Sequence, residues 1–113
     1  MKKEKQKKYK REEQNLVKAV LEYLYYKGFI AIRNNSGVIF IGNGERKRAI
    51  RVGLSGSADI IACSPKGNFV AIECKSKKGK LTNKQKEFLD KVKTLGGVAL
   101  IVRSLDDVIN YFE

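Results

Sequence analysis

One amphipathic helical segment followed by five strand-length segments is the feature that most constrains this fold. Between residues 12 and 27, leucine and valine recur at the three- and four-residue spacing of a helix face. Gly28 is placed where a glycine ends a helix. Polar or glycine-containing loops then separate short segments with strand composition. These predicted strands are residues 29–33, 38–41, 47–52, 58–63 and 69–75.

The remaining segments complete an α/β (α+β) pattern. We expect a second helix over residues 82–95, a wholly apolar and therefore interior strand over 98–102, and a last helix from Ser104. The predicted order is α-β-β-β-β-β-α-β-α, with a central mixed β-sheet flanked by helices. At 113 residues the chain fits one domain, 12–113. Residues 1–11 lack apolar periodicity and are expected to be a basic N-terminal arm or a frayed first helical turn.

The charge of the chain points to a polyanionic partner. Lysine and arginine total 24 against 12 acidic residues, which gives a formal net charge of +12. Nucleic acid is the first candidate for such a partner and an anionic membrane surface the second. The chain has no histidine, which excludes histidine-ligated zinc, catalytic triads that use histidine and a histidine general base.

The cysteines and apolar segments indicate where the protein works. Cys63 and Cys74 form no CxxC motif, so we expect no zinc ribbon and a reducing cytoplasm. The apolar runs are too short to span a bilayer, and the basic start is not followed by the apolar stretch of a signal peptide. We therefore expect a cytoplasmic protein with no membrane segment.

Two carboxylates are predicted to meet across a β-hairpin. Residues two apart in a strand share a face, so Glu73 and Lys75 point the same way. Folding the hairpin about Lys66 places Asp59 directly across from Glu73, with Cβ atoms about 5 Å apart. Such carboxylates coexist when one is protonated or a cation lies between them. Oxygen ligands favour a hard ion, Mg²⁺ or Mn²⁺, and Lys75 beside it has the chemistry to orient a water for phosphodiester hydrolysis. The alternative is a surface salt bridge with the many lysines, and the residues alone leave both open.

Two further polar residues fall on apolar helix faces. The helical period places Glu13 within the stripe of the first helix, so it is predicted to face the sheet. The alternative is an acid that complements the helix dipole. Gln85 precedes Phe88 and Leu89 on the inner face of the second helix. Its alternative role is the N3 partner of Thr82 in a capping box.

Basic residues surround the predicted site. A lysine cluster follows Glu73 directly and either forms a solvated face or clamps phosphates, and the high net charge favours the phosphate clamp. Three tyrosines, at 23, 25 and 26, are candidates for base stacking or for core and interface packing. The residues we expect to contact DNA are Arg33, Asn35, Ser36, Arg51, Lys77, Lys78, Lys80 and Lys84.

In this order, the residues resemble the PD-(D/E)xK nuclease superfamily and, within it, the stand-alone, virus-type VRR-NUC domain. Glu13 is similar to the helical glutamate of the family. The stretch from Arg33 to Gly37 resembles its R-x-N-S-G motif, and Gly56 to Asp59 its G-x-x-D motif. Glu73-Cys74-Lys75 resembles E-x-K, and residues 81–85 its L-(S/T)-x-x-Q helix start. Ala58 stands where the family often has proline.

The resemblance implies a restriction-endonuclease-like core and a set of catalytic roles. Asp59 and Glu73 are expected to bind Mg²⁺ or Mn²⁺ together with the backbone carbonyl of Cys74. Lys75 is expected to position the attacking water, and Glu13 to hold a metal-bound water or a second ion. Gln85 is expected to orient Lys75 or substrate, and to serve as a cap as well only if its side chain swings between the two positions.

Three functions remain open from the sequence. The first is a metal-dependent DNA endonuclease, selective for branched DNA such as a Holliday junction and acting as a homodimer through exposed tyrosines and the last helix. The second is a non-catalytic nucleic-acid-binding module, and the third is a structural subunit of a nucleoprotein assembly. The co-occurrence of Glu13, Asp59, Glu73, Lys75 and Gln85 favours the first. The resemblance places it in the cytoplasm of a bacterium or a phage-infected cell.

Overall fold

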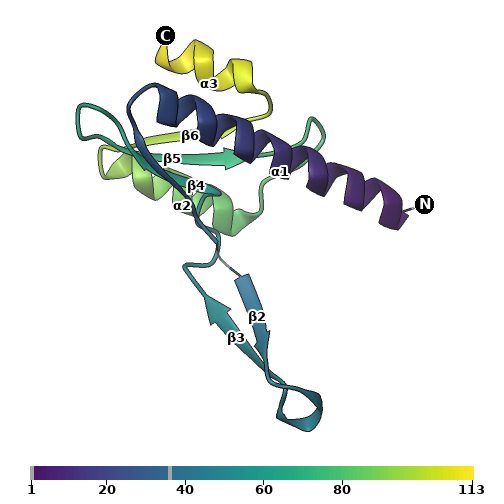
Figure 1. Ribbon diagram of the computed structural model, residues 1–113. Helices are drawn as coiled ribbons and strands as arrows, with labels where there is room; N and C mark the ends of the chain where they lie inside the picture. Colours follow the sequence, from purple (N-terminus) through teal and green to yellow (C-terminus); the bar gives the residue numbers. More distant parts are fainter. Residues whose placement is uncertain (1, 36) are drawn as a thin grey trace.

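The first helix is longer than its apolar stripe predicts. The computed structural model describes residues 2–35 and 37–113, and in it α1 spans Lys2–Tyr26. The basic segment is therefore helical and continuous with the helix that packs on the core, instead of a separate arm. Lysine, glutamine, glutamate and arginine are good helix formers, and the docked half of α1 supplies the nucleus from which the helix extends. Figure 1 shows this N-terminal half extending beyond the sheet.

The other elements follow the predicted order. At the end of α1, the amide of Phe29 donates to the carbonyl of Leu24 around Gly28, which has a φ of 85°. A short 3-10 helix, Gly44–Arg46, lengthens the turn between two strands. The strands are β1 (Ile30–Arg33), β2 (Gly37–Ile41), β3 (Arg48–Val52), β4 (Ile60–Cys63), β5 (Phe69–Cys74) and β6 (Val98–Val102), and the later helices are α2 (Asn83–Thr94) and α3 (Leu105–Phe112).

A four-stranded mixed sheet lies between two helical layers (Figure 1). Its strand order is β1-β4-β5-β6, antiparallel except for the parallel pair of β5 and β6. One core joins α1 and α3 to this sheet through Val20, Ile72 and Val108. A second core joins the opposite face to α2 through Ala71 and Leu89. The prediction of a central mixed sheet flanked by helices is thus confirmed.

Two details of the sheet correct the sequence analysis. In the described part of the chain, β6 pairs with β5 alone and lies at an edge, although its composition predicted an interior strand. It is apolar because helices contact both of its faces. β5 would be exposed on the face of Glu73 if that carboxylate took part in a surface salt bridge, the alternative that the residues alone left open. Instead it is buried on both faces from Val70 to Cys74, because α2 covers the face that carries Glu73.

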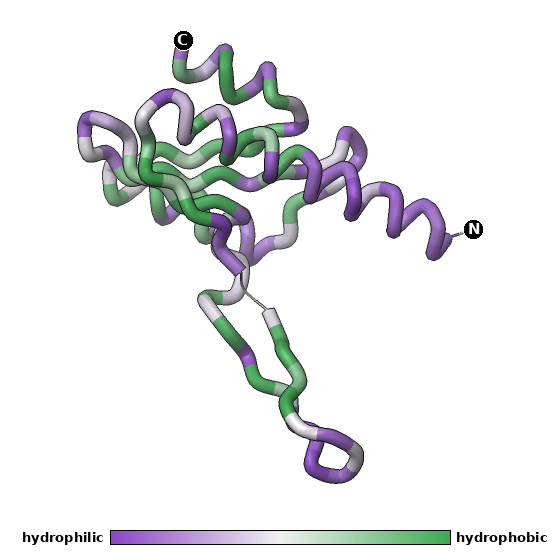
Figure 2. The backbone as a smooth tube through the Cα atoms, viewed as in Figure 1, coloured by the Kyte–Doolittle hydropathy of each residue, from purple (hydrophilic) through white to green (hydrophobic). Residues whose placement is uncertain are grey.

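Strands β2 and β3 form a separate two-stranded ribbon that projects from the body of the molecule (Figure 1). Residues directly opposite in the ladder share a face. Ile39 lies opposite Ile50, whereas Phe40 lies opposite Ala49 and Val38 opposite Arg51. Figure 2 shows the hydrophobic strands and the hydrophilic tip of this ribbon, and Phe40 is 64% exposed. Within the described residues, no helix has the length and apolar character needed to cross a bilayer.

Candidate active site

Asp59 and Glu73 meet at the end of the β4–β5 hairpin. The ladder pairs Ile60 with Ile72 and Ile61 with Ala71, which is the register predicted from a turn about Lys66. Asp59 directly precedes β4, and its Oδ2 accepts a hydrogen bond of 2.8 Å from the amide of Cys74. The expected juxtaposition of the two acids is therefore present.

The loop that carries Asp59 is held by Asn34, a residue that the sequence analysis did not single out. Its Nδ2 donates to the Ser57 hydroxyl at 2.7 Å and to the Ala58 carbonyl at 2.9 Å. Its own amide donates to the carbonyl of Asp59 at 2.7 Å. These bonds tie the end of β1 to the loop and fix the backbone of Asp59. In the sequence, this role was indicated only by the short polar run after a predicted strand. That run does not show which of Asn34 and Asn35 holds the loop.

Gly56 allows the same loop to pack against the start of α2. Its φ of 81° is disfavoured for residues with a side chain, and a Cβ there would lie 2.7 Å from backbone atoms of Lys84. The Nζ of Lys84 also reaches the Ser55 hydroxyl at 3.5 Å. The glycine of the predicted G-x-x-D motif is therefore required for close packing of the loop on α2.

Glu73 is the buried member of the pair, with 3% of its surface exposed. Its Oε1 accepts a hydrogen bond of 3.2 Å from the Nε2 of Gln85 and lies 3.9 Å from the Nζ of Lys75. Its Oε2 is buried and has no hydrogen-bond partner among the described residues. Gln85 therefore contacts Glu73. One of its expected roles required a contact with Lys75 instead, and the described residues show no such hydrogen bond.

Gln85 caps α2 and contacts Glu73 of the candidate site at the same time. Its Oε1 accepts from the amide of Thr82 at 2.9 Å, and the Thr82 hydroxyl accepts from the amide of Gln85 at 3.1 Å. This is the predicted capping box, while Nε2 is directed at Glu73. The cap and the contact with Glu73 need no swing of the side chain, because the two ends of one amide serve the two partners, whereas the expected role toward Lys75 or substrate stays a prediction.

The surroundings of Glu73 fit a cation. Burial first, and then the negative charge of Asp59, raise the pKa of Glu73 to about 8, while Lys75 opposes the shift. A cation beside Asp59 and Glu73 would neutralise both charges and give the unpartnered Oε2 a ligand. The described residues contain no group of three or more His, Cys, Asp or Glu side chains suited to a metal. The remaining ligands would therefore be backbone carbonyls, such as that of Cys74, and water.

Glu13 faces the sheet, as its place in the apolar stripe predicted. Its Oε2 accepts a hydrogen bond of 3.0 Å from the amide of Ser76, which directly follows Lys75 and lies two residues beyond the end of β5. A Cβ on Gly79 would lie 3.1 Å from the same oxygen, so glycine leaves room for it. The carboxylate thereby holds the backbone that follows Lys75.

The thiol of Cys74 points into the core with α1, and burial raises its pKa.

The residues expected to contact DNA lie on several elements. Arg33 ends β1, Arg51 lies on the projecting ribbon, and Lys84 lies in the first turn of α2. Lys77, Lys78 and Lys80 are exposed in the loop after β5, and Asn35 is exposed next to the ribbon. Ser36 lies outside the described residues.

The loop after β5 has a support that the sequence analysis missed. Arg103, which follows β6, donates from one guanidinium nitrogen to the carbonyls of Ser76 at 2.5 Å and Gly79 at 2.7 Å. Nothing in the local pattern indicates this contact, because it joins residues 27 positions apart through the β5–β6 pairing. The lysines of this loop therefore project from a backbone that Arg103 holds in place.

The pKa of Glu73 leads to a stability prediction for the metal-free protein. Its value in the unfolded chain is 4.5 and in the folded chain about 8. Between these values the folded state binds more protons at Glu73, so the contribution of Glu73 to stability is fully present below pH 4.5 and is lost as pH rises through 8. In EDTA, we expect thermal unfolding curves to lose up to about 1.4 kcal/mol per pH unit in this range. Glu73→Gln should remove the slope, and no histidine titrates there. An equal slope in wild type and variant would contradict the assignment.

Comparison with known proteins agrees with the predicted fold. A family model described as "VRR-NUC domain" matches residues 33–105, which include Asp59, Glu73, Lys75 and Gln85 but not Glu13. A solved structure titled "VRR_NUC domain" is similar with a TM-score of 0.66 and 19% sequence identity, over 90% of this chain and 98% of that chain. No curated protein matches the chain. The structural similarity supports the fold class, and the family match covers the carboxylate pair.

Proposed function

Because the chain belongs to the VRR-NUC family, a family with a nuclease-type fold, we propose that it is a Mg²⁺- or Mn²⁺-dependent endonuclease that hydrolyses DNA phosphodiester bonds. The observation that carries this proposal is the buried Glu73, which lies between Asp59, Lys75 and Gln85 with one oxygen unpartnered. A structural ion pair would use both oxygens of a buried carboxylate. A site that is completed by a cation leaves one carboxylate oxygen available to coordinate that cation.

Asp59, Glu73 and the Cys74 carbonyl would hold the metal ion, with Glu13 contributing through water. When bound, such an ion neutralises charge on the scissile phosphate and makes a water molecule more acidic. The protein supplies fixed positions. Asp59 is held by the Cys74 amide, and Glu73 by Gln85.

Lys75 completes the chemistry that this chain provides. Its side chain is 13% exposed and its Nζ lies 3.9 Å from Glu73, so the ammonium group is fixed close to the carboxylates. A donor at that position orients a nucleophilic water and stabilises negative charge that builds up on the phosphate. The exposed lysines of the following loop and of α1 would contact flanking phosphates.

Metal dependence tests the proposed function directly. We expect supercoiled plasmid to be nicked by the purified protein with Mg²⁺ or Mn²⁺, and no nicking in EDTA. Restoring Mg²⁺ in excess over EDTA should restore nicking, which separates metal removal from inactivation. DNA binding without cleavage under all metal conditions would overturn the endonuclease proposal and favour a binding module.

We further propose that the active form is a homodimer that selects branched DNA. One site of this kind cuts one strand, so paired cuts across a four-way junction need two copies related by a two-fold axis. Of the aromatic residues expected at the interface, which also include Tyr111 and Phe112 of the last helix, Tyr25, Tyr26 and Tyr111 are exposed. Tyr23 and Phe112 instead pack against the core. The projecting ribbon adds an apolar face with Ile39, Ile41 and Ile50.

Light scattering and a synthetic junction test this dimer. We expect a dimeric mass at micromolar protein and faster cleavage of a four-way junction than of a linear duplex. Ile39→Glu with Ile41→Glu should give monomers if the ribbon is the interface, and Tyr25→Ser with Tyr26→Ser should do so if the tyrosines are. A monomeric wild type that cuts both DNAs equally would reject the dimer and leave the nuclease proposal intact.

A further inference from the structure

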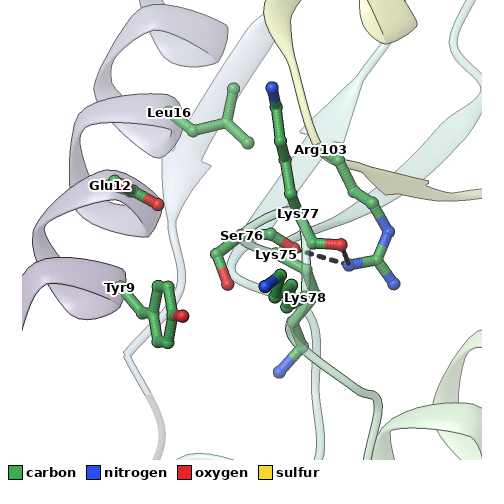
Figure 3. A pocket seen from close by; sticks show the side chains of 8 residues that line it. All are labelled: Tyr9, Glu12, Leu16, Lys75, Ser76, Lys77, Lys78 and Arg103. Atoms are coloured by element: carbon green, nitrogen blue, oxygen red, sulfur yellow. Dashed lines mark hydrogen bonds between the residues drawn. The ribbon is translucent and has the colours of Figure 1, made fainter. Parts of the chain in front are cut away.

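A cleft with mixed chemistry lies beside the proposed active site. It separates the N-terminal half of α1 from the segment that follows β5 and has a volume of about 410 Å³, within the usual range for small-ligand sites. Figure 3 shows Tyr9, Glu12 and Leu16 on the helix side, facing the loop. The opposite side carries Lys75, Lys77 and Lys78. Lys75 is also the lysine in contact with Glu73, so the cleft adjoins the carboxylates.

The helix side of the cleft continues the face of α1 that packs on the core. Tyr9, Glu12 and Leu16 are spaced three and four residues apart, so they share one side of the helix. Leu16 packs against the core, whereas Tyr9 lies beyond the sheet and is only half-buried. Because Tyr9 lines the cleft and does not pack into the core, its ring is available to a ligand.

The loop side of the cleft is fixed before any ligand arrives. Arg103 binds the carbonyls of Ser76 and Gly79 from the side away from α1. Glu13 binds the amide of Ser76 from the helix side. Both ends of the short loop are therefore anchored, and the lysines project from a backbone that loses little freedom on binding.

The combination of groups identifies the ligand. We propose that this cleft binds one unpaired nucleotide of the DNA substrate, next to the bond that is cut. The base stacks on the ring of Tyr9, and its phosphate contacts Lys77 and Lys78. Stacking on an aromatic ring with lysines along the backbone is the general mode of binding single-stranded DNA. A paired base cannot enter, because its faces are stacked within the duplex.

Glu12 gives the cleft a base preference. Its carboxylate accepts hydrogen bonds, and the exocyclic amino groups of cytosine, adenine and guanine donate them, whereas thymine has no amino group. A carboxylate also disfavours a bare phosphate ion as occupant, which leaves the nucleotide as the better fit. This inference rests on the proposed DNA substrate and specifies its local structure: an unpaired nucleotide, preferentially one whose base carries an exocyclic amino group.

Binding in EDTA tests the inference without cleavage. The probes are a fluorescently labelled duplex with one unpaired central cytosine, the same duplex with an unpaired thymine, and a fully paired duplex. Fluorescence anisotropy should show tighter binding of the unpaired-cytosine duplex by the wild-type chain. Tyr9→Ala should weaken that binding about tenfold and leave paired-duplex binding unchanged. Tyr9→Phe should retain it, and Glu12→Gln should reduce the preference for cytosine over thymine.

The control is Asn15→Ala, which shortens an exposed side chain on the same helix that does not line the cleft. It should leave all three affinities unchanged. Equal affinities of the wild type for paired and unpaired DNA, or equal losses on both with Tyr9→Ala, would overturn the inference. Because no cleavage is needed, a Tyr9-dependent preference in a protein that never nicks plasmid would reject the proposed function and retain the cleft. Plasmid nicking without such a preference would retain the proposed function and reject nucleotide binding in the cleft.

Discussion

Asp59→Asn and Glu73→Gln should each reduce Mg²⁺-dependent nicking by at least about a hundredfold. Each change removes one charge and keeps the size of the side chain. The amide oxygen of the introduced asparagine is a weaker metal ligand but still accepts the bond from the Cys74 amide, so the hairpin should keep its register. In the metal-free protein, removing one charge relieves the repulsion that raises the pKa of Glu73, so stability should hold or rise.

Plasmid nicking and thermal unfolding together check this result. The matched control is Glu87→Gln, which removes one carboxylate from an exposed position on α2 and should leave nicking unchanged. Loss of nicking with a lowered melting temperature would indicate a structural role for the pair. Full activity of folded Asp59→Asn would reject the assignment of the active site.

Lys75→Met should lower turnover by about a hundredfold to a thousandfold while changing DNA affinity little. Methionine keeps most of the length of the aliphatic stem and removes the ammonium group near Glu73. That group is placed to act on the water and on charge that develops in the transition state, so its loss affects the rate more than binding.

Single-turnover rates at saturating DNA, with affinities measured in EDTA, separate these effects. Lys77→Met is the control, because Lys77 is exposed in the next loop and has no contact with Glu73 in the described structure. It should weaken binding and preserve the rate. If Lys75→Met instead weakens binding in proportion and keeps the single-turnover rate, Lys75 is a phosphate contact and not part of the catalytic step.

Local sequence signals predicted the geometry of the carboxylate pair. Pro65 and Gly67 flank Lys66 in the hairpin turn, and Gly67 has a φ of 87°, so the turn fixed the register of β4 and β5. Thr82 and Gln85 were recognised as a capping box for similar reasons, since a cap needs only residues three apart. The inward position of Glu13 followed from helical periodicity alone.

Features that depend on distant parts of the chain were not predictable. Asn34 and Arg103 act across 23 to 27 positions, and the residue types alone do not identify their partners. The edge position of β6 depends on strand order, which hydrophobicity does not encode. Helix formation in the basic segment reflects residue propensity supported by docking of the rest of α1, whereas periodicity reports only which residues are buried.

The projecting ribbon can change in length without altering the main sheet. In the described residues its two strands form ladder bonds only with each other, and Gly37 and Val52 at its base lie opposite one another. Residues can therefore be added or removed in pairs along it without shifting any strand of the main sheet. Changes in its length would alter how far the protein reaches across a partner or a substrate while leaving the alignment of Asp59 with Glu73 intact. Reach and chemistry are consequently free to evolve separately in this fold.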